Sequence, residues 1–325
     1  MKLNRSICGI LRGAAPLAWA LGLWTGIAQA VDERILLDAT INGKAARLVF
    51  DTGASDLILF KQGAERLGLK VTQPPADIRL APGEVAVGRT EECDFVLGTT
   101  RTRIAFSVFA PPSFLKLEMD GVVGWPPIRY NTIRIDAGLK QATWLTNTPP
   151  EAATWTKLRI RSQSRVLSLE IPGQDDTGGV LTVDTGSSYG VALSSARWQA
   201  WKAAHTNPPT TLLAGYMPGA GTVVAEESWA NELTFGPLVL AEVPVKPANA
   251  AQQGAGSAGF QASLGLAALK RVDLILDGSL GIAYLRPKAS HSRSGGRVVS
   301  YFSNSLPSHG RAGELQGLDQ RKPMP

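Results

Sequence analysis

The sequence Arg47-Leu-Val-Phe-Asp51-Thr-Gly-Ala-Ser55 returns 133 residues later as Val180-Leu-Thr-Val-Asp184-Thr-Gly-Ser-Ser188. In both copies an apolar run ends in an aspartate, which is followed by Thr-Gly, a small residue and a serine. An apolar run of this kind predicts a buried strand, and the glycine permits a sharp turn after it. The repeat therefore predicts two carboxylates, each held at a turn that follows a buried strand.

The first copy has the side chains that keep such a turn rigid. Thr52 and Ser55 carry short hydroxyls that can bond the local backbone, and Gly53 lacks the Cβ that would obstruct the turn. Leu57-Ile-Leu then returns the chain to the core. The second copy supplies the corresponding set: Asp184, Thr185, Gly186 and Ser187. We predict that these residues support a pair of catalytic aspartates, one in each loop.

A second region of the chain repeats in the same order. Three pairs of residues, 141 positions apart, carry it: Gly124 and Gly265, Asp136 and Asp277, and Ala142 and Ala283. Two ordered regions of similarity indicate two copies of one structural unit. We place the first unit in residues 31–149 and the second in residues 150–287, with the boundary in the polar, proline-containing stretch 146–155.

Between these motifs the chain consists mostly of short β-rich runs separated by Gly, Pro and Asn. The clearest runs are residues 35–41, 47–50, 56–60, 102–108, 133–135, 180–183, 232–235 and 272–276. The best helical patterns are short and cover residues 61–67 and 194–204. The sequence therefore predicts a mainly β protein.

Two such loops, related by a pseudo-two-fold axis, would bring Asp51 and Asp184 face to face. Carboxylates about 3 Å apart cannot both ionise, so they share one proton. The ionised member can take a proton from water as that water attacks a peptide carbonyl. The protonated member can donate to the carbonyl oxygen and later to the leaving nitrogen. This chemistry requires no metal and no other cofactor, and we predict none.

On these motifs the sequence resembles the pepsin/retropepsin superfamily of aspartic proteases, over about residues 33–287. Asp120-Gly-Val-Val-Gly124-Trp resembles the element that braces the first active-site loop in that family. Gly265 would be the second brace, although Ser263 makes it a weaker match. Residues 133–136 and 274–277 resemble the strands that open the closing hairpins of bacterial members.

The resemblance implies a mainly β, two-lobed pepsin/retropepsin-like fold with pseudo-two-fold symmetry, in which the substrate lies between the lobes. It further implies that Thr52 and Thr185 form hydrogen bonds across the lobes and lock the two loops together. The implied activity is that of an aspartic endopeptidase acting on a peptide or protein substrate. Because both loops are in one chain, we expect an active monomer.

Two departures from the family pattern concern the active-site loops and the flap that covers them. Ala54 replaces a hydroxyl that Ser187 supplies in the second loop, which is expected to raise the apparent pKa of the pair and to permit activity outside strong acid. No tyrosine occurs between Asp51 and Gly124 to serve as a first-lobe flap residue, and we expect that flap near residues 81–91. Tyr216 is a candidate flap residue of the second lobe, with a turn-stabilising surface tyrosine as the alternative.

The two ends of the chain have compositions of their own. Residues 1–30 place three basic residues before an apolar run and end in Ala28-Gln-Ala30, which predicts a cleaved signal peptide and an exported, periplasmic or secreted bacterial protein. No stable membrane insertion is expected, because the apolar run is too short. Residues 288–325 are rich in Ser, Gly, Pro and Arg and predict a disordered basic tail.

The net charge of +6 belongs to these end segments. Residues 1–30 contribute +3 and residues 288–325 contribute +4, which leaves −1 for residues 31–287. A folded part close to neutral predicts no nucleic-acid groove. After the predicted cleavage only Cys93 remains, so no internal disulfide is expected.

Two other functions compete with proteolysis by paired aspartates. Gly186-Ser-Ser188-Tyr-Gly190 fits the G-x-S-x-G nucleophile pattern, but that pattern requires a helix directly after it, where Val191-Ala-Leu predicts a strand. The second alternative is a catalytically silent periplasmic peptide-binding module with the same fold. An Asp51→Ala variant separates this binding module from the protease, because a silent binder would keep its function. No H-E-x-x-H or comparable cluster supports a metalloprotease.

Overall fold

The computed structural model describes residues 34–73, 85–110, 118–173, 178–217, 221–249, 252–253 and 259–288, with only the backbone for residues 213–217 and 221–223. The predicted signal peptide, residues 289–325 of the predicted tail and residues 81–84 of the predicted flap lie outside these ranges. By its internal contacts the chain separates into Met1–Ser290 and His291–Pro325, and every described residue belongs to the first unit.

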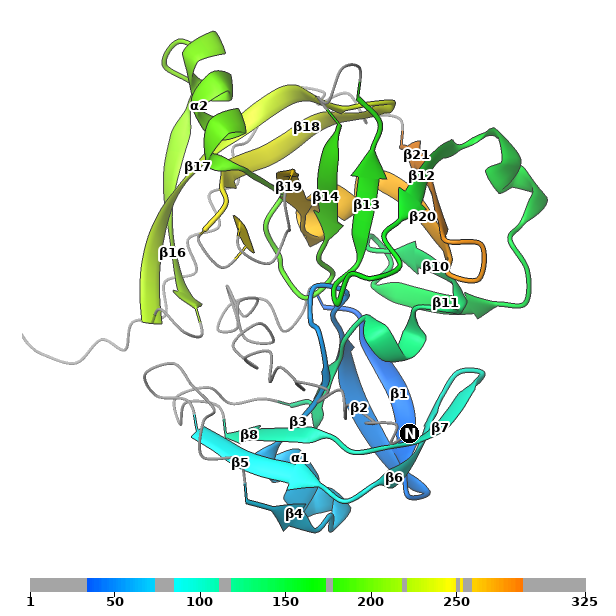
Figure 1. Cartoon of the computed structure of the whole chain (residues 1–325). Coiled ribbons are helices and arrows are strands. Elements are labelled where there is room, and N and C mark those ends of the chain that lie inside the picture. Colours follow the sequence, from blue (N-terminus) through cyan, green and yellow to red (C-terminus); the bar gives the residue numbers. More distant parts are fainter. Residues whose placement is uncertain are drawn as a thin grey trace, which may run out of the picture. The chain divides into compact units, whose positions relative to one another are not determined.

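The first sheet is built by the chain up to residue 123 and has nine strands in the order β4-β5-β8-β3-β9-β2-β1-β6-β7 (Figure 1). Its strands are β1 (Leu36–Ile41), β2 (Lys44–Phe50), β3 (Leu57–Phe60), β4 (Val71–Thr72), β5 (Val85–Thr90), β6 (Cys93–Leu97), β7 (Thr100–Ile104), β8 (Ser107–Ala110) and β9 (Gly121–Val123). Helix α1 (Lys61–Leu67) follows β3 and has the predicted bounds.

The second sheet has twelve strands in the order β11-β10-β20-β21-β12-β13-β14-β19-β15-β18-β17-β16. Its strands are β10 (Thr132–Asp136), β11 (Gln141–Leu145), β12 (Thr156–Ile160), β13 (Ser168–Ile171), β14 (Gly179–Val183), β15 (Val191–Leu193), β16 (Thr210–Met217), β17 (Gly221–Phe235), β18 (Leu238–Pro247), β19 (Phe260–Leu264), β20 (Val272–Asp277) and β21 (Ile282–Pro287). The short helical elements are η3 (Pro126–Ile128), η4 (Pro150–Thr154), α2 (Ser195–Ala204) and α4 (Leu266–Leu269).

The duplication predicted from the sequence extends to the strand pairing. β2 runs parallel to β9 with Val49 opposite Val122, and β14 runs parallel to β19 with Thr182 opposite Ser263. Equivalent residues of the two pairs are 133 residues apart in the first strand and 141 residues apart in the second, as in the sequence repeat. Each of β9 and β19 also pairs antiparallel with the strand that follows its active-site loop, β3 or β15. The two halves therefore place their aspartate-bearing strands in the same frame.

The sheets do not divide the chain at residue 149. The hairpin β10–β11 belongs to the predicted first unit, yet β10 pairs with β20 and so lies in the second sheet. The closing hairpins of the two units, β10–β11 and β20–β21, are thus side by side in one sheet. Pairing between them leaves neither β10 nor β20 as an unpaired edge, which explains why the hairpin leaves its own unit.

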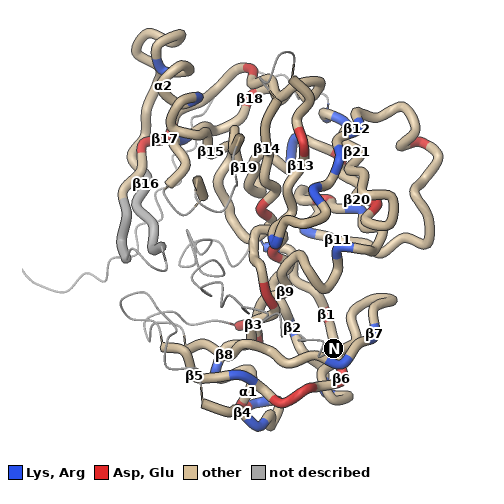
Figure 2. Tube along the Cα trace, viewed as in Figure 1, with Lys and Arg blue, Asp and Glu red and all other residues tan. Residues whose placement is uncertain are grey.

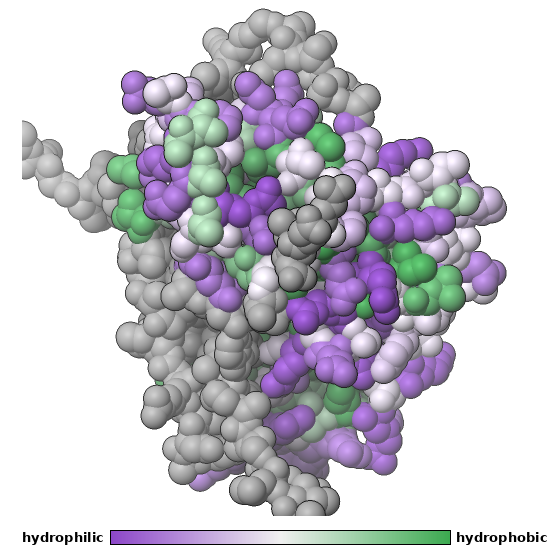
Figure 3. All heavy atoms as spheres, turned by 45° about the horizontal axis from the view of Figure 1, so that its top comes forward, coloured by the Kyte–Doolittle hydropathy of each residue, from purple (hydrophilic) through white to green (hydrophobic). Residues whose placement is uncertain are grey.

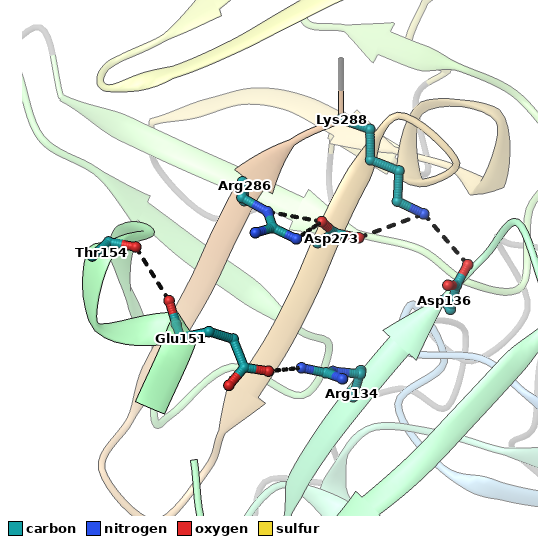
Figure 4. A network of polar contacts seen from close by, with 7 residues as sticks. All are labelled: Arg134, Asp136, Glu151, Thr154, Asp273, Arg286 and Lys288. Carbon is teal, nitrogen blue, oxygen red and sulfur yellow. Dashed lines mark hydrogen bonds and ion pairs between the residues drawn. The ribbon is translucent and has the colours of Figure 1, made fainter. Parts of the chain in front are cut away.

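Ion pairs connect these closing hairpins on the solvent side, as Figure 4 shows. The ammonium of Lys288 lies 3.4 Å from Asp136 and 3.6 Å from Asp273, and Arg286 lies 2.6 Å from Asp273. Partly exposed pairs of this kind contribute about 0–1 kcal/mol each. The backbone N–H of Lys288 also donates to the carbonyl of Arg271, so the folded part includes the first residue of the predicted tail.

One cluster of buried apolar side chains extends through both sheets. It includes Phe50 and Val123 beside the first aspartate and Val183 and Leu264 beside the second. On the face in Figure 3 the described hydrophobic side chains form small areas among hydrophilic ones. Figure 2 shows basic and acidic residues interspersed along the described chain. Each described helix is too short or too polar to cross a bilayer.

The prediction of one continuous strand at residues 102–108 is wrong. This segment is divided between β7, which pairs with β6, and β8, which pairs with β3 and β5. The break falls at Phe106, whose side chain is buried and whose N–H donates to the hydroxyl of Thr90. The predicted strand at residues 232–235 is only the end of β17. The second predicted helix begins at Ser195, with Ser194 as its N-cap.

Candidate active site

Each aspartate directly follows a strand whose end is fixed by a parallel neighbour. Asp51 follows β2 and donates its N–H to the carbonyl of Val123 at 2.9 Å. Asp184 follows β14 and donates its N–H to the carbonyl of Leu264 at 2.8 Å. The two donors and the two acceptors are related by the same offsets as the sequence repeat. The backbone therefore holds both aspartates in equivalent positions.

The two active-site loops are locked together by the threonines. The hydroxyl of Thr52 donates to the carbonyl of Val183 at 2.7 Å, and the hydroxyl of Thr185 donates to the carbonyl of Phe50, also at 2.7 Å. Each hydroxyl also accepts from the backbone N–H of the other threonine, at 3.0 Å and 3.2 Å. These are the cross-lobe bonds that the family resemblance implied. Both threonines are fully buried, so the four bonds form without competition from water.

Both carboxylates are buried, and that of Asp51 reaches the opposite loop. Asp51 is 4% exposed and Asp184 is 0% exposed. Within each loop a backbone N–H binds the carboxylate: Gly53 donates to Oδ1 of Asp51 at 2.9 Å, and Gly186 donates to Oδ1 of Asp184 at 3.1 Å. A Cβ on Gly186 would lie 2.2 Å from the carboxyl carbon of Asp51. The carboxylate of the first loop therefore packs directly on the backbone of the second.

The predicted glycine braces lie under both loops. The N–H of Gly124 donates to the carbonyl of Asp56, and a Cβ there would lie 2.6 Å from the carbonyl oxygen of Ala54. The N–H of Gly265 donates to the carbonyl of Gly190, and a Cβ there would lie 2.3 Å from the carbonyl oxygen of Tyr189. Only glycine permits these close approaches, so the second brace is as tight as the first.

The electrostatics of the pair are unequal. Burial raises the pKa of Asp51 well above its ordinary value, and the negative charge of Asp184 raises it further; the N–H of Gly53 and the charge of Arg34 act against this. Burial also raises the pKa of Asp184, but the hydroxyls of Ser187 and Tyr189 are the strongest of several groups that act to lower it. The hydroxyl donors therefore favour the charged form of Asp184 and have no counterpart among the groups acting on Asp51.

Tyr189 and Ser263 are site residues that sequence reasoning missed. The Tyr189 hydroxyl lies 2.9 Å from Oδ2 of Asp184 and 2.8 Å from the hydroxyl of Ser263. Ser263, which weakened the sequence match of the second brace, is therefore a partner of the tyrosine that binds the aspartate. The ammonium of Lys246 lies 4.4 Å from the centre of the Tyr189 ring. A signal was available, because the second loop has one residue more than the first before its strand resumes.

The remaining predicted residues have diverse surroundings. Ser55 and Ser187 are buried in the loops, as expected of residues that support them. Tyr216 lies on β16 opposite Thr222 of β17, near the end of the long hairpin at the sheet edge in Figure 1. Within the described ranges no group of three or more His, Cys, Asp or Glu side chains could hold a metal ion.

The competing serine nucleophile lacks its required context. Ser188 is followed by strand β15 rather than by a helix, whereas the G-x-S-x-G pattern needs a strand, the serine and then a helix. Nδ1 of His205 lies 2.7 Å from the carbonyl oxygen of Trp201, and its ring stacks on that residue. The other two histidines that could serve as the base lie outside the described residues.

One comparison with known proteins agrees with this geometry. Residues 37–126 match the aspartyl protease family, and this range includes the Asp51 loop and its brace. Among solved structures, the retroviral protease-like domain of Ddi1 from Leishmania major is similar, with 21% identity, 35% of this chain and 90% of that chain covered, and a TM-score of 0.28. No curated protein matches the chain.

The family match covers the first loop, and the strand register and cross-lobe bonds repeat its frame around the second. This duplicated frame carries two buried carboxylates, and the match supports a protease-type function. Residues 37–126 of the chain are thus similar to the aspartyl protease family, and the mainly β frame that holds their aspartate is repeated around Asp184.

Proposed function

We propose that the chain is an aspartic endopeptidase in which Asp51 and Asp184 activate a water molecule to hydrolyse peptide bonds. The observation that carries the proposal is the packing of the buried Asp51 carboxylate on Gly186 of the opposite loop, two residues from the buried Asp184. Two buried carboxylates so placed cannot both be ionised at little cost, so one holds a proton while the other acts as a base.

The reaction then needs only these two groups and water. The ionised carboxylate accepts a proton from water as the water oxygen bonds to the peptide carbonyl carbon, and the protonated carboxylate donates to the carbonyl oxygen. In the second step the carbon–nitrogen bond breaks, the nitrogen receives a proton from one carboxyl of the pair, and a hydroxyl of the tetrahedral intermediate gives its proton to the other carboxylate as the carboxyl product forms. The pair returns to its starting state with one proton. The locked threonines keep both carboxylates in place throughout, which reduces the reorganisation that the reaction requires.

The proposal extends to the setting of the enzyme. Both loops belong to one chain and bind each other through Thr52 and Thr185, which supports activity as a monomer. The N-terminal sequence supports export to the periplasm or the medium, where peptides and unfolded proteins would be the substrates. Neither nucleic acid nor stable membrane insertion has a part in the proposal.

A peptide library assay between pH 3 and 7 tests the proposal directly. The full chain should cleave the library, and a statine-type transition-state mimic should inhibit it. Asp51→Asn and Asp184→Asn should each lower kcat by about 10²–10⁴-fold, because each removes one partner of the acid–base pair. Ser188→Ala should retain activity.

The contrary outcomes separate the alternatives. Cleavage that survives both asparagine variants but not Ser188→Ala would favour the serine nucleophile. Peptide binding without any cleavage, unchanged in Asp51→Asn, would favour the silent binding module. Either result would overturn the proposed mechanism.

A further inference from the structure

The second active-site loop contains one residue more than the first. The carbonyl groups of Ala54 and Ser187 accept from equivalent donors, and so do the carbonyl groups of Asp56 and Gly190. One residue lies between the acceptors in the first loop, and two residues lie between them in the second. The extra residue lets the second loop project a side chain that has no counterpart in the first. That side chain belongs to Tyr189.

Tyr189 is turned inward, toward its own aspartate. It is 7% exposed and packs with Ala192 and Ala248, and its hydroxyl reaches both Asp184 and Ser263. Ser263 is 2% exposed, and the register places it on β19 where β9 has Val122. Both polar groups of the second half thus occupy places where the first half has no equivalent. Tyr189 binds Asp184 and Ser263, with a further side-chain hydrogen bond to Gln252.

The direction of the hydrogen bonds follows from a count of protons. Burial raises the pKa of Tyr189 well above its ordinary value, so its hydroxyl carries a proton. That single proton is best given to Oδ2 of Asp184, because a carboxylate is the strongest acceptor within reach. Ser263 must then donate to the tyrosine oxygen. The chain of donors runs from Ser263 through Tyr189 to Asp184, and its last bond is strongest when Asp184 is ionised.

We infer that Tyr189 is a positioning residue that makes Asp184 the ionised member of the pair, the base, and leaves the shared proton on Asp51, the acid. The inference rests on the proposed function and deepens it, because it assigns the two roles. Ser263 supports the tyrosine in this task and does not touch either carboxylate.

The first loop offers Asp51 no comparable donor. Ala54 has no hydroxyl, and the groups that bind the Asp51 carboxylate within the described structure are the backbone N–H groups of Gly53 and Ala54. The polar side chains near the end of that loop bind one another instead: the hydroxyl of Ser107 donates to Asp56 at 2.8 Å. An ionised Asp51 would thus receive fewer hydrogen bonds than an ionised Asp184.

The charged groups around the pair come from three further elements. Lys246 on β18 is 8% exposed and favours ionisation of Asp184, and Glu227 on β17 faces Lys246. Arg34, just before β1, is 8% exposed and favours ionisation of Asp51. The two cations therefore act on opposite members of the pair. Burial raises the pKa of Asp51 by more than Arg34 lowers it, and the hydroxyl donors of the second loop act on Asp184 alone.

The decisive experiment titrates each carboxyl alone, by carbon-13 NMR of labelled aspartate in the full chain. In an Asp51→Asn background, adding Tyr189→Phe should raise the pKa of Asp184 by about one to two pH units, since a donor to the charged form is lost. In an Asp184→Asn background, the same change should leave the pKa of Asp51 within about 0.3 pH units. The phenyl ring keeps the packing, so a general structural effect would move both.

The active enzyme supplies a second readout. In the pH profile of kcat/KM, the acid limb reports the base, so Tyr189→Phe should move that limb to higher pH by about one unit. Ser263→Ala should move it in the same direction by less. Ser107→Ala, which removes a buried hydroxyl of the first half that binds no catalytic group, is the matched control and should move neither limb.

Two outcomes would overturn the inference. One is an Asp184 carboxyl whose titration is unchanged by Tyr189→Phe, and the other is an equal shift of both carboxyls. The NMR titration needs no catalytic activity. Loss of cleavage in both asparagine variants with no effect of Tyr189→Phe would therefore refute the role of the tyrosine and leave the protease intact.

Discussion

The loop at Asp51 and the loop at Asp184 have almost the same backbone and quite different side-chain surroundings. Their strands share one register, their threonines exchange equivalent bonds and their braces make equivalent close contacts. Yet within the part of the chain that the structure describes, Asp184 receives hydroxyl bonds where Asp51 receives only backbone bonds. The frame is symmetric because two carboxylates must meet, and the surroundings are asymmetric because an acid and a base need different pKa values.

Among substitutions that leave both aspartates in place, the largest effect should come from breaking the contact between the loops at Gly186. In Gly186→Ala the new Cβ would lie 2.2 Å from the Asp51 carboxyl, so the carboxylate or the loop must move. A displacement of about 1 Å at a catalytic group can cost about 100-fold in rate. We expect kcat to fall by at least about that factor, measured on a cleaved library peptide, while the chain remains folded by circular dichroism.

A control for this variant is available on the surface of the same half. Gly281 has a φ of +67° in the β20–β21 turn, with open space around its Cβ position. Gly281→Ala should cost stability but leave kcat unchanged. A Gly186→Ala enzyme with normal kcat would show that the two carboxylates do not depend on this approach.

The symmetric part of the comparison predicts equal effects of two substitutions. Thr52→Val and Thr185→Val each remove a hydroxyl that donates one cross-lobe bond and accepts another. Loss of two buried bonds should lower the free energy of unfolding by about 2–4 kcal/mol in either variant, measured by urea denaturation. Because the bonds couple one loop to the other, the double variant should lose less than the sum.

Unequal losses in free energy of unfolding for the two threonine variants would contradict the symmetry of the frame. Thr90→Val is a suitable comparison, because Thr90 is also a buried threonine whose hydroxyl accepts a backbone N–H, but within the first half alone. The loss in free energy of unfolding caused by Thr90→Val should add to the loss caused by either active-site threonine variant.

Much of this site could be predicted from the sequence, because its parts are short and local. An apolar strand, an aspartate and a Thr-Gly turn are adjacent in the chain, and the 133-residue and 141-residue offsets relate the second copy to the first. The lengths of α1 and of the closing hairpins follow from equally local patterns. The register of the strands then agrees with the repeat residue by residue.

What could not be predicted depends on partners that are distant in sequence. Tyr189, Ser263 and Lys246 come from a loop and two different strands, and only the folded sheet brings them together. The two copies of the aspartate motif are related by a constant offset of 133, so the repeat does not reveal the extra residue of the second loop that places Tyr189. Likewise, no local pattern indicates that β10 leaves its own unit to pair with β20.

The smallest predicted effect sharpens the asymmetric part of the comparison. Ala54→Ser gives the first loop the hydroxyl that Ser187 supplies in the second, at a buried position where a serine adds one oxygen. A donor to the charged form lowers the pKa of Asp51, and the basic limb of the kcat/KM profile reports loss of the acid's proton. That limb should therefore move to lower pH, by about half a unit. The acid limb, which reports Asp184, should stay in place.

The same substitution also bears on stability, with a definite sign. The folded pKa of Asp51 is raised above its unfolded value. The contribution of this group to stability is therefore fully present only below the unfolded pKa, and it is lost as the pH rises through the folded pKa. Ala54→Ser lowers the folded pKa and so reduces this loss at neutral pH. At each pH we compare the free energy of unfolding of the variant with that of the parent chain. The difference in favour of the variant should be larger at pH 7 than at pH 3. If the variant instead moves the acid limb and leaves the basic limb, the roles of the two aspartates are the reverse of those inferred, and the asymmetry of the loops has another cause.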